Sequence, residues 1–359
     1  MPKATSISNS VSIYIDLLRL LASLLVFAAH VRGLSMPYLP NNLLSHGREA
    51  VAVFFVLSGL VISYVVAEKE TGWRSYLVAR LARIMPVCLL AIGVTTVCDF
   101  IGHGANPASY GEFYAPESWL GLLRYLSFTN QLWFSHVTFG SDQPYWSLGF
   151  EIQYYVIFGL CAFVRSPWRW PVTAMWMLIV GPKILMYFPL WLLGVATYRA
   201  LASGRFNSTK AGIAAMLLSP IPALVGKKLC DLSGHPATNM YMTWPPVTEL
   251  YNFLYFSSIG VSIALSILAW NGLFGRMNVW PTTAQRAIRW FAGASFTLYL
   301  VHQPIIAMTT GFYRPDPANE SMALGLSLAV FIVVLLLAEI AERRKRVYSD
   351  LFRGLVVGG

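Results

Sequence analysis

The run from Val11 to Val31 is long and apolar enough to cross a lipid bilayer, yet it carries Asp16, Arg19 and His30. About 20 apolar residues span the hydrocarbon core of a bilayer. At that depth an ionisable side chain is costly unless it faces protein or trapped water. At about 100° per residue, Arg19 and His30 return to within about 20° of each other. The run therefore predicts a membrane helix with one narrow polar stripe.

The polar stripe has two interpretations. Asp16 and Arg19 are three residues apart, so a buried ion pair that only fixes helix packing would account for both. It would not account for His30, which lies about 16 Å further along the same face. Because the pKa of histidine lies near neutrality, an imidazole in this setting is a candidate for proton transfer.

Composition agrees with a polytopic, all-α membrane protein. The chain has 359 residues, 56% of them hydrophobic and 12% charged, whereas charged residues approach a quarter of a soluble domain. Apolar runs predict a bundle of about ten transmembrane helices. They lie near residues 11–31, 46–66, 76–97, 145–164, 171–180, 184–198, 211–225, 249–270, 290–310 and 321–340. The run 119–128 is too short to cross, which favours a re-entrant or interfacial helix.

The distribution of basic residues predicts the orientation. With ten spans, most Lys and Arg fall on the side of the N-terminus, which the positive-inside rule places in the cytoplasm. The net charge of +10 then needs no nucleic acid as a partner. We expect a membrane domain over residues 1–345 and a short cytoplasmic tail over 346–359, without a cleaved signal peptide. The four cysteines show no metal-binding or disulfide spacing, and no metal is expected.

Two further groups of polar residues lie inside or beside apolar runs. Arg80 and Arg83 share a helix face at the predicted cytoplasmic end of their span. They are either anchors of the positive-inside kind or a bidentate grip on phosphate groups. Glu151 lies one helical turn after Ser147 in the run that begins at Trp146. It either pairs with an arginine or orients a catalytic imidazole.

His302 follows Ser295 and Tyr299 at four- and three-residue steps, which gives a second polar helix face. A packing histidine and a catalytic one are both compatible with this pattern. Ser58 stands before Gly59 in the run FFVLSG. Small residues in membrane helices usually mark close packing, so a nucleophilic role for Ser58 is the weaker interpretation.

Together these segments resemble the acyltransferase 3 family of integral membrane acyltransferases, which modify sugars and other hydroxylated acceptors. Five motifs carry the resemblance, and they stand in the family's order from one end of the chain to the other. They are the 16–30 stripe, HGREAVAVFFVLSG at 46–59, RLARIMP at 80–86, WSLGFEIQYY at 146–155 and SFTLYLVHQPI at 295–305. A departure lies at Arg48–Glu49, where the family more often has a small residue, so the local loop geometry is open.

The resemblance implies a ten-helix bundle in a bacterial inner (plasma) membrane and an acyl-CoA donor used from the cytoplasmic side. The default donor is acetyl-CoA. The resemblance also assigns the family's essential histidine to His30, its arginine pair to Arg80 and Arg83, and its motif glutamate to Glu151. Some family members carry an appended hydrolase-like domain. The sequence shows none, so we expect transfer by the membrane domain alone or with a partner protein.

The expected mechanism uses His30, oriented by Glu151, as general base on an acceptor hydroxyl of a glycan or another hydroxylated molecule. Arg19 would guide the donor or stabilise the oxyanion. Residues expected to support the acceptor or the site are Asp16, Ser58, Trp146, Ser147, Tyr299 and His302. Transient acylation of His30 is an open variant. The rival function is a transporter or flippase with a proton relay, and a structural scaffold is a third. The sequence does not reveal the acceptor or the oligomeric state.

Overall fold

A computed structural model describes residues 7–31, 46–70, 72–111, 114–234, 246–313 and 319–357. Helices account for nearly all regular structure in this part of the chain, and a single isolated bridge joins Ala115 and Gly140. Helices are the expected result, since a spanning segment must satisfy every backbone hydrogen bond within itself. The all-α prediction is confirmed.

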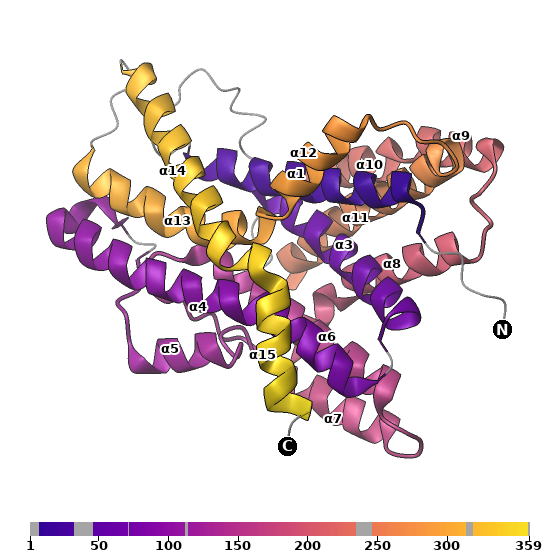
Figure 1. The fold of residues 1–359 in the computed structure, drawn as a ribbon, viewed down its shortest axis with the longest axis horizontal. Coiled ribbons are helices and arrows are strands. Elements are labelled where there is room, and N and C mark those ends of the chain that lie inside the picture. The colour runs from indigo at the N-terminus through magenta and orange to yellow at the C-terminus, as the bar shows by residue number, and fades with distance from the viewer. Residues whose placement is uncertain are drawn as a thin grey trace. The chain divides into compact units, whose positions relative to one another are not determined.

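The helices vary in length from one turn to more than thirty residues (Figure 1). The α-helices are α1 (Asn9–Val31), α3 (Gly47–Glu68), α4 (Trp73–Ala105), α5 (Trp119–Leu126), α6 (Trp146–Phe163), α7 (Arg169–Val180), α8 (Pro182–Ala202), α9 (Thr209–Leu218), α10 (Pro220–Ser233), α11 (Pro246–Phe274), α12 (Thr282–Ala292), α13 (Ser295–Phe312), α14 (Glu320–Ile340) and α15 (Lys345–Val357).

Seven stretches of helix in the described residues have the length and apolar character of a membrane span, or eight if the bent pair α12–α13 counts as one. This makes the chain a multi-pass membrane protein. The sequence predicted about ten spans. The three further predicted spans correspond to α6, α7 and α13. α7 has only 12 residues, which is too few to cross. α6 and α13 have 18 residues each and are long enough, but polar residues such as Glu151 and His302 lower their apolar character.

The chain forms two compact units. Unit 1 comprises Met1–Ala22, Arg48–Thr71 and Gln153–Ala292, and unit 2 comprises Ser23–Gly47, Gly72–Ile152 and Gly293–Gly359. In unit 1, α3 and α8 meet through backbone contact, since a side chain on Gly59 or Gly194 would collide with the opposing helix. Small residues allow membrane helices this approach. Around them lies an apolar core that includes Val11, Leu57, Leu60, Tyr198 and Ile267.

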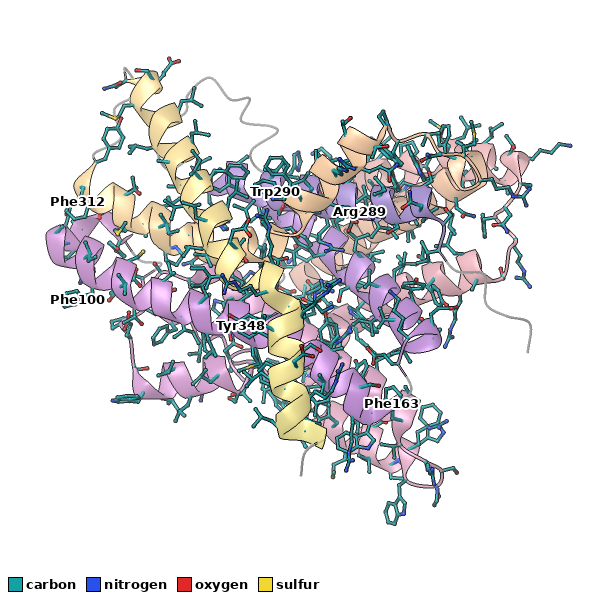
Figure 2. All side chains as sticks on the ribbon, in the orientation of Figure 1. Phe100, Phe163, Arg289, Trp290, Phe312 and Tyr348 are labelled. Carbon is teal, nitrogen blue, oxygen red and sulfur yellow. The ribbon has the colours of Figure 1, made fainter. Side chains whose placement is uncertain are left out.

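Unit 2 is built on α4, the longest α-helix described. α13 packs along it (Figure 1), and Gly102 of α4 meets Met308 and Gly311 of α13 in backbone contact. The outer sides of this pair are apolar, as Phe100 and Phe312 show by pointing away from the protein (Figure 2). α15 also packs on α4. It gives regular structure to most of the segment predicted as a tail.

The predicted short helix at 119–128 is confirmed as α5. Ser118 caps it by accepting a hydrogen bond from the Gly121 amide at 3.0 Å. Its exposed side chains are large and apolar, with Trp119 83% exposed, while Tyr125 is fully buried. A short helix with an exposed apolar face suits the surface of a bilayer.

Candidate active site

Two histidines from opposite ends of the sequence meet inside unit 2. His30 lies in the last turn of α1 and His302 in the middle of α13, with Nδ1 of His30 3.2 Å from Nε2 of His302. Their ring centroids are 4.9 Å apart. Phe27, one turn before His30, places its ring edge-on to His302 at 6.0 Å. The end of α1 therefore packs on α13 through Phe27 and His30.

Backbone carbonyls determine which nitrogen of each neutral ring carries the proton. Nδ1 of His30 lies 2.8 Å from the Val26 carbonyl, and Nδ1 of His302 lies 2.6 Å from the Leu298 carbonyl. Because a carbonyl only accepts, both Nδ1 atoms are protonated in the neutral rings. The lone pair on Nε2 of His302 then faces the Nδ1–H of His30. Nε2 of His30 has no hydrogen bond from any residue that the structure describes, so its lone pair can accept a proton.

The polar face predicted for α13 binds the start of α6. The hydroxyls of Ser147 and Tyr299 are 2.9 Å apart and both residues are buried. Trp146 is half-buried beside Phe150 on the same helix. Glu151 is half-buried one turn after Ser147, within electrostatic reach of Cys88 on α4. Ser147 and Tyr299 thus link α6, which carries Glu151, to α13, which carries His302.

His30 and Glu151 were expected to form a hydrogen-bonded pair, and among the described residues they do not. The Nδ1–H of His30 is directed to Val26 and His302 instead. The reason lies in the packing, because Phe27 and His30 both contact His302 of α13. The spacing of residues in one helix predicts which residues share a face, but it does not predict which neighbouring helix that face meets.

The two arginines also belong to unit 2. Arg80 is buried on α4, with its guanidinium 5.4 Å from the ring of Tyr76, and Arg83 is half-buried one turn further on. A pair of guanidinium groups one turn apart is a donor set that fits the phosphates of a donor such as acyl-CoA. Among the described residues, no group of three or more His, Cys, Asp or Glu side chains is placed to hold a metal ion.

The remaining candidates lie in unit 1. Arg19 and Asp16 form the ion pair that the packing interpretation required, at 3.2 Å with both side chains 21% exposed. The hydroxyl of Ser58 is 3.0 Å from the hydroxyl of Tyr155 and accepts a hydrogen bond from the Trp191 indole at 3.2 Å. Ser58 therefore holds α3 against α6 and α8, which agrees with the structural interpretation.

The loop from 127 to 145 contains polar residues that sequence reasoning did not single out. Asn130, Gln131, Ser141 and Asp142 are all at most 5% exposed. The amide and hydroxyl of Ser141 donate hydrogen bonds to Asp99 of α4 at 2.7 and 2.6 Å. Gly140, the residue before Ser141, has a φ of +57°, and a side chain at this position would collide with Asp99. A polar loop sealed against a spanning helix gives no periodic signal in the sequence.

The end of this loop carries a buried carboxyl group. Burial raises the pKa of Asp142 well above its ordinary value, and the Tyr145 amide opposes that shift. The Tyr145 ring stacks on Tyr125 of α5 with centroids 4.1 Å apart, and its hydroxyl donates to the Tyr125 carbonyl at 2.9 Å. α5 and the start of α6 are therefore fixed to each other within unit 2.

Two contacts show how far His302 lies from the arginine pair along the axis of α4. Tyr145 lies beside Cys88, and Ser147, two residues later, bonds Tyr299. Gly102 meets Met308 at the other end, so α4 and α13 run in parallel. The first contact aligns His302 with position 91 of α4 and the second with positions 93–96. At 1.5 Å per residue, the level of His302 therefore lies about 12–20 Å from Arg83 and about 17–24 Å from Arg80 along the axis.

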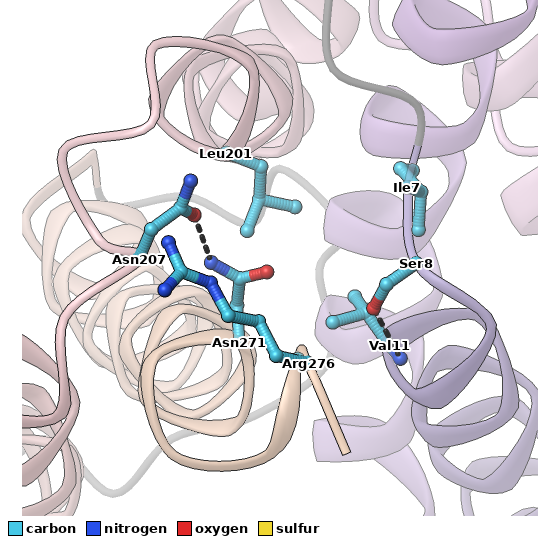
Figure 3. A pocket seen from close by; sticks show the side chains of 8 residues that line it. Ile7, Ser8, Val11, Leu201, Asn207, Asn271 and Arg276 are labelled. Atoms are coloured by element: carbon cyan, nitrogen blue, oxygen red, sulfur yellow. Dashed lines mark hydrogen bonds between the residues drawn. The ribbon is translucent and has the colours of Figure 1, made fainter. Parts of the chain in front are cut away.

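Unit 1 contains a separate small cavity of about 130 Å³, and none of the predicted site residues lines it. Its polar wall consists of Ser8, Asn207, Asn271 and Arg276 (Figure 3). The Asn271 amide donates to Asn207 at 2.9 Å and to the Phe206 carbonyl at 3.0 Å. These bonds fix the turn between α8 and α9 to the end of α11.

Curated relatives include three acyltransferases. The chain is 23% identical to the peptidoglycan O-acetyltransferase OatA of Listeria monocytogenes over 99% of its own length and 59% of that protein. It is 25% identical to the putative peptidoglycan O-acetyltransferase YrhL of Bacillus subtilis over 76% of the chain and 46% of that protein. It is 31% identical to the acyltransferase MdmB of Streptomyces mycarofaciens over 46% of the chain and 42% of that protein.

The chain thus spans about three fifths of the first relative's length and under half of the other two. No solved structure matches it. A family model described as an acyltransferase domain matches residues 12–341, which includes both histidines, the arginine pair and Glu151. With this match over most of its length, the chain belongs to the acyltransferase 3 family.

Proposed function

We propose that the chain is a membrane-embedded O-acyltransferase that moves an acyl group, by default acetyl, from acyl-CoA to a hydroxyl group of a sugar or glycan. The peptidoglycan O-acetyltransferases among its relatives support a glycan acceptor, and the apolar helices support a place in the bacterial inner (plasma) membrane. The observation that carries the proposal is the His30–His302 pair, which leaves one imidazole lone pair available within the same unit as a pair of arginines.

His30 acts as the general base. Its Nε2 atom removes the proton from the acceptor hydroxyl, and the resulting oxygen nucleophile attacks the thioester carbonyl. The C–S bond breaks, and the proton passes from His30 to the departing thiolate. The products are an O-acyl ester and the free thiol of CoA. Direct transfer needs no acyl-enzyme, although an acyl-His30 intermediate would give the same products.

His302 positions His30. Its Nε2 lone pair accepts from the Nδ1–H of His30, which orients the ring and favours the imidazolium that forms during proton transfer. Glu151 supplies a negative charge in the same unit, one turn from the Ser147–Tyr299 contact. We propose that this charge stabilises the imidazolium through space, without a direct hydrogen bond.

Arg80 and Arg83 hold the phosphates of the donor at the predicted cytoplasmic end of α4. The arginines lie about 12–24 Å along the axis from the level of His302, and the extended thioester arm of the donor would cover this distance. Replacing both arginines by Gln removes two guanidinium groups that bind donor and transition state alike. The KM for the donor should therefore rise at least 10-fold while kcat changes little. An unchanged donor KM would remove the arginines from the donor site.

The proposed function is tested with the purified full chain in liposomes, supplied with acetyl-CoA and isolated cell-wall glycan. We expect free thiol and an acetyl ester on the glycan, detected by mass spectrometry, in equal amounts. His30→Ala should form both products at least 100-fold more slowly. Movement of glycan across the bilayer without any gain of acetyl mass would instead establish the transporter and refute the enzyme.

A further inference from the structure

A cavity of about 750 Å³ lies along the last turns of α4, entirely within unit 2. This volume is within the range of small-molecule binding sites. One wall is the segment 114–117 that leads into α5, and the other is the face of α4 from Thr96 to Gly104. This cavity is called the α4 groove below.

One half of the α4 groove is aromatic and polar. The ring of His103 stacks on Tyr114 with centroids 4.5 Å apart, and Tyr110 braces Tyr114 edge-on at 5.2 Å. Glu117 lies beside the Thr96 hydroxyl, and burial, followed by the nearby Asp99 charge, raises the pKa of Glu117. A braced aromatic ring presents a flat face to the C–H groups of a sugar, and a carboxylate accepts hydrogen bonds from its hydroxyls.

The other half of the α4 groove is apolar and exposed. Its side chains are Val97, Phe100 and Ile101, which are 57%, 83% and 43% exposed on a helix that is long enough to span a bilayer. Val97 ends the predicted span 76–97, and Ile101 lies only about 6 Å beyond it along the helix, so these side chains lie at the boundary of the hydrocarbon core. A water-soluble sugar would leave this half of the groove unused.

The position of α5 places the polar half of the groove at the membrane surface. Trp119, Leu120 and Leu123 form the exposed apolar face of α5, and such a face enters the boundary between headgroups and acyl chains. Glu117 stands two residues before Trp119. The sugar-facing residues are therefore at headgroup level, directly beside the apolar residues of α4.

The groove also continues the order of groups along α4. The arginine pair is at one end, His302 lies at a middle level, and the groove follows, with Thr96 at most about 8 Å and Gly104 about 12–20 Å beyond His302 along the axis. A donor entering from the arginines and an acceptor entering from the groove would approach the histidines from opposite sides.

We propose that the α4 groove binds the acceptor as a lipid-linked glycan, with a sugar between Tyr114 and Glu117 and the lipid chain along Val97, Phe100 and Ile101. This inference rests on the proposed function and names its substrate class. It assigns recognition of the acceptor to residues outside the five motifs that mark the family in the sequence.

The test measures binding without any acyl donor, using the full chain in nanodiscs. The three probes are an isoprenoid-linked disaccharide, the same disaccharide without lipid, and the isoprenoid phosphate without sugar. We expect the linked molecule to bind at least 10-fold more tightly than either part. Tyr114→Ala and Glu117→Gln should each weaken its binding about 10-fold, whereas Tyr114→Phe, which keeps the ring, should retain it.

Two matched controls stand on the same predicted face of the membrane. Phe312→Ala removes an exposed aromatic ring from α13, and Glu320→Gln neutralises an exposed carboxylate at the start of α14. Neither should change binding. Equal binding of the free disaccharide would overturn the lipid-linked acceptor, and equal binding of the isoprenoid phosphate would overturn the sugar site.

The outcome is separable from that of the proposed function. If the wild-type chain binds the linked disaccharide and Tyr114→Ala and Glu117→Gln weaken that binding, but the wild-type chain transfers no acyl group, the groove assignment stands and the enzymatic proposal fails. If the wild-type chain transfers acyl groups and Tyr114→Ala and Glu117→Gln leave acceptor binding unchanged, the enzymatic proposal stands and the groove assignment fails.

Discussion

At the scale of single residues, the contacts of His30 decide which of its nitrogens can do chemistry. The Val26 carbonyl and His302 both lie on the Nδ1 side of the ring. The sequence identified both histidines as candidates but expected Glu151 to be the partner of His30. A contact between residues separated by 272 positions depends on how α1 packs on α13, and no spacing rule reports that.

The role of His302 predicts a particular pattern of variants. His302→Phe keeps a ring against Phe27 but removes the acceptor, so kcat should fall about 10- to 100-fold with the donor KM unchanged. His302→Gln restores an acceptor oxygen and should recover part of kcat. If the Phe and Gln variants lose the same activity, His302 serves only packing. The measurement is steady-state acyl transfer at equal amounts of folded protein.

At the scale of elements, the apolar runs predicted most helices because a membrane leaves a spanning segment few alternatives. α1, α3, α4 and α5 lie close to where the sequence placed them. The buried loop at 127–145 was not foreseen, since its polar residues resemble those of an ordinary surface loop. The loop is buried because Gly140 lies directly against Asp99 of α4. These two residues are 41 positions apart in the sequence, so no local pattern predicts their contact.

The backbone contact between α3 and α8 predicts an effect on stability. Gly194→Ala places a methyl group against the backbone of Val56, and overpacking of this kind costs about 1–3 kcal/mol. The thermal midpoint of the purified protein should therefore fall. Gly325→Ala on α14 is the matched control, because a side chain there meets no atom within 4 Å. An unchanged midpoint for Gly194→Ala would show that the two helices pack less closely.

At the scale of the whole molecule, the distribution of basic residues predicts which end of each helix faces the cytoplasm. Cysteine labelling of intact cells tests this prediction. Ala108→Cys, just beyond α4, should react with a membrane-impermeant maleimide added outside, and Asp350→Cys on α15 should react only after permeabilisation. The four native cysteines, of which Cys88, Cys98 and Cys230 are buried, provide the background. The reverse pattern would invert the orientation.

The division into two units also separates the candidate residues. His30, Arg80, Arg83, Ser147, Glu151, Tyr299 and His302 all belong to unit 2, whereas Asp16, Arg19 and Ser58 belong to unit 1. Composition predicted one continuous membrane domain and gave no sign of this division. The reason is physical, because α1 and α6 each contribute residues to both units, and a unit assembled from separated segments leaves no boundary in the sequence.

The most direct measurement is single-turnover acyl transfer by His30→Ala in liposomes, compared with the wild-type chain at saturating acetyl-CoA and glycan. Removing the proton acceptor should lower the rate at least 100-fold while donor binding stays within about 2-fold. Transfer at a near-normal rate by a folded His30→Ala protein would contradict proton removal by His30.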